Sequence, residues 1–267
     1  MWIPRSLLVA VVATTCLWAQ PSTVTMKPPL LKPGEGFAIT TGNGEVHAYG
    51  EAKKEAPMGN LAQLVWMRME GTEWASRDVR FTCTGKAGPF LCWNQAGHGK
   101  VNLGKALRES CNLAFLAWIT QSQLQWQADY GDGAARTRME AVFAPFLGRR
   151  LPAGEGLPPL TAAWMGDGDL LRTSPEAFLR WLMEPEQAQV LSFGRRFLAG
   201  FWSDVKDLIG KEGWWFKTGT ATVPGDPMAT CAWVAGGRGE AIVVLFMPRG
   251  TAPEALARIR ELLGTKG

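Results

Sequence analysis

Three short segments of the chain carry side chains whose types suggest a reactive or ligand-binding site. Residues 57–62 read Pro-Met-Gly-Asn-Leu-Ala, residues 110–112 read Ser-Cys-Asn, and residues 217–220 read Lys-Thr-Gly-Thr. Together they offer hydroxyl, amide and ammonium groups. A serine hydroxyl is a poor nucleophile until a nearby base takes its proton. The chemistry open to the chain therefore depends on whether a serine meets a lysine.

The pattern of apolar residues indicates which elements carry these segments. Residues 37–49 read as two strands around Asn43-Gly44, a strong signal for a tight hairpin turn. Gly-rich turns separate three later apolar runs, which favours antiparallel strands. These strands are expected over 214–218, 229–234 and 241–247. Helices are expected over 60–69, 103–119, 174–184 and 253–263. The serine segment therefore falls in a predicted helix, and Lys217 falls on a predicted strand.

The order of the three segments resembles the penicillin-binding, transpeptidase and serine β-lactamase superfamily. That family has Ser-x-x-Lys at a helix start, then Ser-x-Asn, then Lys-Thr-Gly on a strand. Gly97-His98-Gly99 before the second segment and Ala232-Trp233-Val234 after the third also match. The resemblance covers about residues 36–264. It implies an α/β fold of the class D β-lactamase and transpeptidase type, an antiparallel sheet flanked by helices, with a helical lobe inserted between early and late strands.

The resemblance also implies roles for the second and third segments, which face each other across a cleft in the family. Ser110 supplies a hydroxyl and Asn112 an amide to the ligand, and Lys217 supplies positive potential. Thr218 and Thr220, on either side of Gly219, are expected to hydrogen-bond a peptide carboxylate. The backbone N–H groups of Gly59 and Thr220 are expected to form an oxyanion-type pocket.

The first segment departs from the family pattern. Read as the Pro-x-Ser-x-x-Lys slot, residues 57–62 place Gly59 at the nucleophile and Ala62 at its lysine. Glycine has no oxygen and alanine has no amine, so this position cannot form an acyl-enzyme. A literal Ser-x-x-Lys occurs at Ser203 and Lys206, but it precedes Lys217 so closely that its order in the chain does not fit the family.

The composition excludes several classes of protein. The 267 residues are 46% hydrophobic and 19% charged, and the net charge is +4 without a basic run, which argues against nucleic-acid binding. The mean hydropathy of −0.04 argues against a polytopic membrane protein. Residues 1–19 fit a secretory signal peptide, 20–35 a linker and 36–267 the family domain. We expect a periplasmic or secreted protein with no membrane span once the signal is removed.

Export makes disulfide bonds possible, and Cys83 with Cys92 is the credible pair because a Gly/Pro-rich turn joins them. Cys111 and Cys231 lie in apolar stretches and are expected to be buried thiols. The chain has no Cys-x-x-Cys and only His47 and His98 as imidazoles, so neither a metal site nor a cofactor is predicted.

The sequence therefore predicts a non-catalytic module of the cell envelope that binds a peptidoglycan stem peptide, a β-lactam or a cell-wall protein partner. The alternative is an active transpeptidase, carboxypeptidase or β-lactamase whose nucleophile lies elsewhere in the chain. A third possibility is a structural partner of cell-wall machinery that binds no small ligand. Covalent labelling by penicillin separates the first two, and titration with a stem peptide separates the first from the third.

Overall fold

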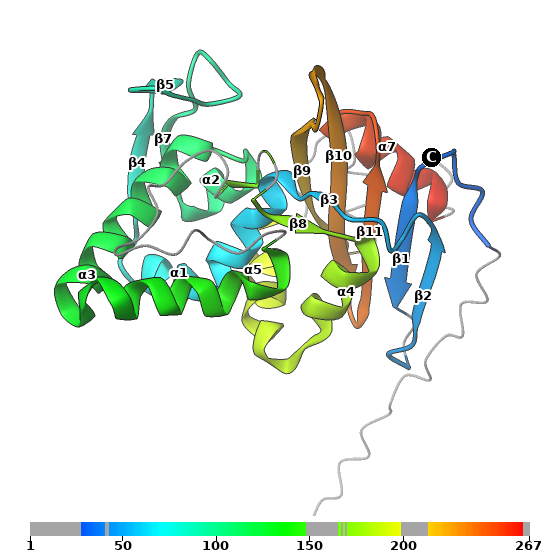
Figure 1. Cartoon of the computed structure of the whole chain (residues 1–267), viewed down its shortest axis with the longest axis horizontal. Coiled ribbons are helices and arrows are strands. Elements are labelled where there is room, and N and C mark those ends of the chain that lie inside the picture. The colour runs from blue at the N-terminus through cyan, green and yellow to red at the C-terminus, as the bar shows by residue number, and fades with distance from the viewer. Residues whose placement is uncertain are drawn as a thin grey trace, which may run out of the picture.

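A five-stranded sheet is the centre of the computed structural model, which describes residues 28–40, 43–147, 165–166, 168, 170–198 and 213–263. Its strand order is β2-β1-β11-β10-β9, and every neighbouring pair is antiparallel. The strands are β1 Gly36–Thr40, β2 Val46–Gly50, β9 Trp215–Val223, β10 Asp226–Arg238 and β11 Ala241–Met247. The predicted sheet of early and late strands is confirmed (Figure 1).

The N-terminal hairpin joins the last part of the chain through direct strand pairing. Within the hairpin, Ala38 lies opposite Ala48, and on its other side the same residue lies opposite Val244 of β11. Closing a sheet between segments this far apart in the chain is entropically costly, so packing on both faces has to compensate for it.

Alternation along β10 explains how both faces are packed. Ala232 and Val234 contribute to a core shared with α7, which spans Ala252–Leu262. Trp233 and Ala235 point the other way, into the larger core beneath the remaining helices. Successive strand residues face opposite sides of a sheet, so one strand serves both cores. Figure 1 shows α7 apart from the helical lobe, on the far side of the sheet.

The helical lobe lies between the early and late strands in sequence, as the predicted fold class requires. Its longer helices are α1 Ala62–Ser76, α3 Asn112–Phe143, α4 Pro175–Met183 and α5 Ala188–Leu198. The helix α4 begins as expected, with the Ser174 side chain accepting a hydrogen bond from the Ala177 N–H at 3.2 Å. No helix in the described part of the chain is long and apolar enough to cross a bilayer.

Short elements complete the lobe. They are the strands β3 Ala56–Pro57, β4 Arg80–Cys83, β5 Lys86–Ala87, β6 Phe90–Leu91, β7 Gly99–Asn102 and β8 Arg172–Thr173, the 3-10 helices η1 Gly59–Leu61, η2 Ala144–Phe146 and η4 Pro185–Gln187, and the helix α2 Leu103–Arg108. The strands form the pairs β3–β8, β4–β7 and β5–β6. Such small ladders bury little apolar surface of their own and depend on contacts outside the ladder.

The helix predicted over 103–119 is wrong in one respect, because the structure breaks it into α2 and α3. Ser110 stands in the break with φ +49°, a left-handed conformation that non-glycine residues seldom adopt. The Cys111 N–H donates to Ala106 O at 2.9 Å and closes the turn. The serine segment therefore lies in a strained turn, where its side chains face a neighbouring element instead of following the helix surface.

The described residues before β1 are fixed against α7. Glu35 accepts hydrogen bonds from the Arg258 guanidinium at 2.8–3.1 Å, and both side chains are at least 95% buried. Hydrogen bonding to this carboxylate raises the pKa of Arg258. The Arg258 guanidinium also donates to Leu30 O, so this segment packs on the domain. The predicted signal peptide, residues 1–19, lies outside the described residues.

Candidate functional site

A cleft with a volume of about 690 Å³ lies between β9, the turn before α3 and the small hairpins of the lobe. It is lined by Asn60, Pro89, Phe90, Leu91, Trp93, Arg108, Glu109, Ser110, Asn112, Leu113, Leu116, Met165, Thr218, Thr220, Ala221, Thr222, Thr230, Thr251, Ala252 and Pro253. A cavity of this size suits a small peptide or a drug-sized molecule. Four of the six ligand-binding residues predicted from the sequence line it: Ser110, Asn112, Thr218 and Thr220.

Lys217 lies directly beneath the cleft and contacts Ser110. Its Nζ donates to Ser110 Oγ at 2.6 Å and to Thr218 O at 2.8 Å. The lysine is 2% exposed and the serine 9% exposed. Burial disfavours the charged amine and lowers the pKa of Lys217 from 10.5 to about 7. A hydroxyl and an amine of this pKa in hydrogen-bond contact can exchange a proton near neutral pH.

A row of hydroxyl groups follows the edge strand β9. Thr218, Thr220 and Thr222 alternate along the strand and all line the cleft. Gly219 lies between them and approaches the 3-10 helix η1, because a Cβ at this position would stand 2.8 Å from Met58 O and 3.0 Å from Leu61 N. Hydroxyls spaced every second residue suit the carbonyl and carboxylate oxygens of an extended peptide.

The 3-10 helix η1 contributes Asn60 to the site, and α1 contributes Gln63, which is buried and reaches the site through its contact with Asn112. Asn60 lines the cleft, and Gln63 Nε2 donates to Asn112 Oδ1 at 3.3 Å. Residues at i and i+3 share one helix face, so these two amides have the spacing of the family's Ser-x-x-Lys. Gly59 and Ala62, the positions singled out from the sequence, are both buried and do not line the cleft.

Gly59 is held in a position that no other residue fits. Its φ is +55°, and a Cβ there would stand 2.5 Å from Thr220 O. Its N–H donates to Gly166 O at 2.9 Å. The oxyanion-type pocket expected at Gly59 and Thr220 is therefore wrong as far as Gly59 is concerned, because this N–H already has an acceptor within the protein.

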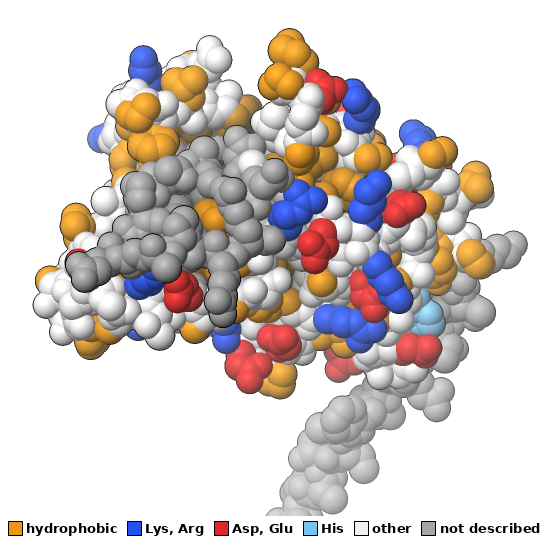
Figure 2. Space-filling model, in the orientation of Figure 1, with side chains coloured by type: hydrophobic (Ala, Val, Ile, Leu, Met, Phe, Trp, Pro, Cys, Tyr) orange, Lys and Arg blue, Asp and Glu red, His pale blue; other side chains and the backbone are white. Residues whose placement is uncertain are grey.

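An apolar rim closes the side of the cleft opposite β9. Leu91 and Trp93 are 59% and 64% exposed, which is unusual for such large side chains. The Trp93 Nε1 donates to Glu109 O at 2.7 Å, so the ring is fixed beside the serine turn. In Figure 2 hydrophobic side chains lie on the projection formed by the small hairpins and on the separate tip of the β9–β10 hairpin. Sequence reasoning missed this rim, and its only signal was an apolar cluster within a Gly/Pro-rich segment.

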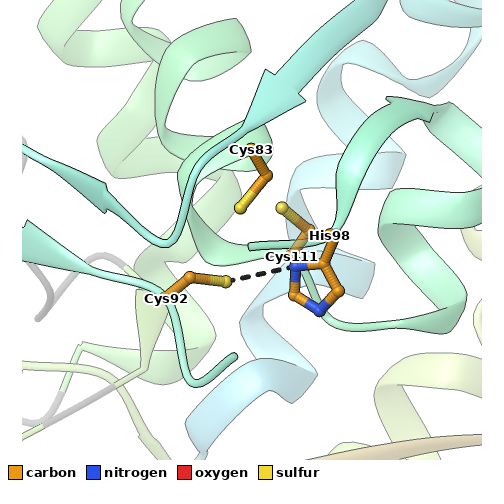
Figure 3. A group of neighbouring side chains, drawn as sticks. All are labelled: Cys83, Cys92, His98 and Cys111. Carbon is orange, nitrogen blue, oxygen red and sulfur yellow. Dashed lines mark hydrogen bonds between the residues drawn. The ribbon is translucent and has the colours of Figure 1, made fainter. Parts of the chain in front are cut away.

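The cysteines do not follow the predicted pairing. Cys83 and Cys92 are free thiols and do not form the expected disulfide. Cys111 and His98 lie beside them, and the four donor atoms lie within 4.8 Å of one another (Figure 3). The hydrogen bond with Cys111 lowers the pKa of the Cys92 thiol to about 5 and raises the pKa of the Cys111 thiol.

Ser203 and Lys206, the literal Ser-x-x-Lys pair, lie outside the described residues. The structure therefore does not place this pair relative to the cleft.

Comparison with known proteins shows the fold and no more. No protein-family model matches the chain, and no curated protein matches it in sequence. Among solved structures, a chain of a peptidoglycan synthase complex that coordinates polymerization and crosslinking superposes with a TM-score of 0.58 at 14% identity, over 87% of this chain. A class D β-lactamase from Fusobacterium nucleatum subsp. polymorphum gives 0.54 at 14% identity, over 86% of this chain and 91% of the enzyme.

A third structure, Pseudomonas aeruginosa PBP2 in complex with WCK 5153, gives a TM-score of 0.53 at 14% identity over 80% of this chain. The chain spans only 56% of the synthase-complex chain and 62% of PBP2. The molecule thus has the penicillin-binding transpeptidase and β-lactamase fold, and the resemblance stated from the sequence is confirmed at the level of the fold.

Proposed function

We propose that the protein is a non-catalytic, penicillin-binding transpeptidase-like module of the periplasm or cell surface. Its cleft binds the carboxylate end of a peptidoglycan stem peptide, or a β-lactam of the same shape, without forming a covalent bond. One observation carries the proposal. A cleft lined by Ser110, Thr218 and Thr220 beside a buried lysine has the amide of Asn60 where a nucleophile is needed, and the buried amide of Gln63, in contact with Asn112, where its base is needed.

The cleft has the groups that a non-covalent site for such a ligand needs: a cation, hydroxyl donors and an apolar surface. The Lys217 amine, when protonated, places positive charge 2.6 Å from the Ser110 hydroxyl. The hydroxyls of Ser110, Thr218 and Thr220 line the cleft and can donate hydrogen bonds to a carboxylate. The apolar rim at Leu91 and Trp93 offers a surface for the aliphatic or bicyclic part of the ligand. The likeness in fold to a peptidoglycan synthase chain supports a ligand from the cell wall.

The nucleophile and the base that acylation requires are lacking at Asn60 and Gln63. An amide side chain at Asn60 cannot open a strained ring, and Gln63 cannot accept a proton from a nucleophile. These two features act together, because a nucleophile without its base, or a base without a nucleophile, does not form an acyl-enzyme.

A second function is favoured by one contact, the 2.6 Å hydrogen bond between Lys217 and Ser110. In that function neutral Lys217 takes the hydroxyl proton, Ser110 Oγ attacks the carbonyl carbon, and the C–N bond of the amide breaks as the nitrogen receives a proton. The product is an ester on Ser110. This is the displaced-nucleophile alternative, now with a specific residue.

Titration with an acyl-Lys-D-Ala-D-Ala peptide, followed by calorimetry, tests the proposed function. We expect saturable binding that Thr218→Val and Thr220→Val each weaken by about 10- to 100-fold, the value of a hydrogen bond to a charged group. Thr120→Val is the matched control, since its hydroxyl bonds Leu116 O on α3 and lies outside the cleft lining. Absence of binding at millimolar peptide overturns the proposal and leaves a purely structural role.

A further inference from the structure

The small hairpins beside the cleft hold a cluster of soft metal ligands that the proposed function does not use. The Cys3His cluster consists of Cys83, Cys92, His98 and Cys111. Cys83 ends β4, Cys92 follows β6, His98 precedes β7 and Cys111 precedes α3. Figure 3 shows the three sulfur atoms and the imidazole gathered around one space, although they come from four separate segments.

The spacing of the donor atoms fits a tetrahedral ion. Bonds of about 2.3 Å to sulfur and about 2.0 Å to nitrogen put two donors on one zinc ion about 3.5–3.8 Å apart. The Cys92 Sγ lies 3.4 Å from His98 Nδ1, and all four donor atoms lie within 4.8 Å of one another. Small side-chain rotations therefore bring the whole set to bonding distance.

The ligands are buried and their backbones are fixed. The three cysteines are at most 2% exposed and His98 is 9% exposed. The Cys92 N–H donates to Gly85 O at 2.9 Å, and the Lys105 ammonium donates to His98 O at 2.9 Å. Three thiolates and one divalent cation carry a net negative charge, and the nearby ammonium of Lys105 reduces its cost.

The hairpins also have a reason to need a metal. The strands β5 and β6 have two residues each, and the strands β4 and β7 have four residues each. Large side chains of this segment, Leu91 and Trp93, face solvent instead of a core. Segments that bury so little apolar surface are commonly held together by a structural ion, whose binding energy then contributes directly to folding.

The cluster is joined to the cleft through the chain itself. Cys111 stands between Ser110 and Asn112, so fixing its sulfur fixes the turn that presents both side chains. On the other side, the Trp93 ring packs edge-on against His98, with centroids 5.3 Å apart. An ion in the cluster would therefore hold two neighbouring parts of one cleft wall, the serine turn and the apolar rim.

We propose that the Cys3His cluster binds one Zn²⁺ as a structural ion that stabilises this wall of the cleft. The proposal departs from the expectation of no metal drawn from the sequence, and it is independent of whether the cleft binds a peptide. All four ligands are supplied by the protein, which leaves no open position for catalysis.

The test begins with the full chain, exported and purified without chelators, and measures its zinc by elemental mass spectrometry. We expect about one zinc per chain, and loss of this zinc in Cys83→Ser and Cys92→Ser. Cys231→Ser is the matched control, because Cys231 is equally buried but its thiol lies 3.5 Å from Ala221 O, in another part of the molecule. The control should keep its zinc.

Two further measurements keep the test decisive if a serine variant fails to fold. Removal of metal from the wild-type chain under reducing conditions should lower its melting temperature, and added zinc should restore it. Cobalt in place of zinc should give the charge-transfer and d–d bands of a tetrahedral thiolate site. A metal-free chain with a disulfide among the three clustered cysteines overturns the proposal, as does zinc that all the variants retain.

Discussion

The substitution Gly59→Ala tests whether the 3-10 helix η1 is packed so closely on β9 that no side chain fits at its first residue. A Cβ at Gly59 would stand 2.5 Å from Thr220 O and 2.7 Å from Thr220 N, and both are backbone atoms that cannot rotate away. The φ of +55° adds strain for any residue other than glycine. The two effects can be separated, because a turn elsewhere in the chain shows only one of them.

Gly239 is the matched position, because its φ is +56° and a Cβ there would meet no other atom within 4 Å. Left-handed strain alone costs about 1–2 kcal/mol for an alanine. Forcing a methyl group into a packed region adds about 1–3 kcal/mol. We therefore expect Gly239→Ala to lose about 1–2 kcal/mol and Gly59→Ala about 2–5 kcal/mol of unfolding free energy.

Urea denaturation followed by tryptophan fluorescence measures both variants. With a slope of about 2 kcal/mol per molar urea, the midpoint of Gly59→Ala should fall below that of Gly239→Ala by about 0.5–1.5 M. Equal midpoints would refute the reasoning, because they would mean that a side chain at position 59 finds room beside β9 and that the packing does not exclude a nucleophile there.

Other predictions concern buried charge and the register of the first segment. Because burial lowers the pKa of Lys217 from 10.5 to about 7, the unfolded state binds more protons than the folded state between these values. Wild-type stability should therefore rise with pH across this window by about 1.4 kcal/mol per unit relative to Lys217→Met, and parallel pH profiles of urea midpoints would contradict this. Arg258→Met leaves Glu35 buried without its guanidinium and should cost about 3–5 kcal/mol in the same assay; a loss under about 1 kcal/mol would show that the pair is not buried in solution. The double substitution Asn60→Ser/Gln63→Lys restores Ser-x-x-Lys on the cleft side of α1 and should confer covalent labelling by fluorescent penicillin, whereas a folded double variant without label would contradict the assignment.

Much of the sheet follows from local sequence signals. Asn43-Gly44 sets the hairpin, and the apolar runs around Trp233 and Val244 set the late strands, because turn chemistry and alternation are both local properties. A sheet that joins the early hairpin to the late strands was expected and is confirmed, and the strand that pairs with the hairpin is β11. The residues that determine these features lie within a few positions of one another in the chain, which is why the sequence alone predicts them.

The break at Ser110 and the register of the first segment depend on tertiary contacts. Residues 103–119 have a helical pattern throughout, and only packing against Lys217 shows why Ser110 leaves the helix. Gly59 with Ala62 and Asn60 with Gln63 have the same spacing, so the sequence alone does not choose between them. The choice is made by the contact of Gln63 with Asn112.

The cysteine cluster escaped prediction for a related reason. The ligands are separated by 8, 5 and 12 residues, a pattern unlike the short Cys-x-x-Cys spacing of familiar zinc sites. Two small hairpins and a helix start bring them together, and neither the hairpins β4–β7 and β5–β6 nor the break at Cys111 was expected. Spacing rules apply when one loop carries the ligands, and here four segments carry them.

The mass of the intact protein after prolonged incubation with an excess of a β-lactam is the most direct test of the central claim. That claim is that this cleft binds without acylating. We predict an unchanged mass under denaturing conditions, together with reversible occupancy of the cleft before denaturation. A mass increase equal to one β-lactam, mapped to a peptide that contains Ser110, would contradict the claim and establish the serine–lysine pair as a working active site.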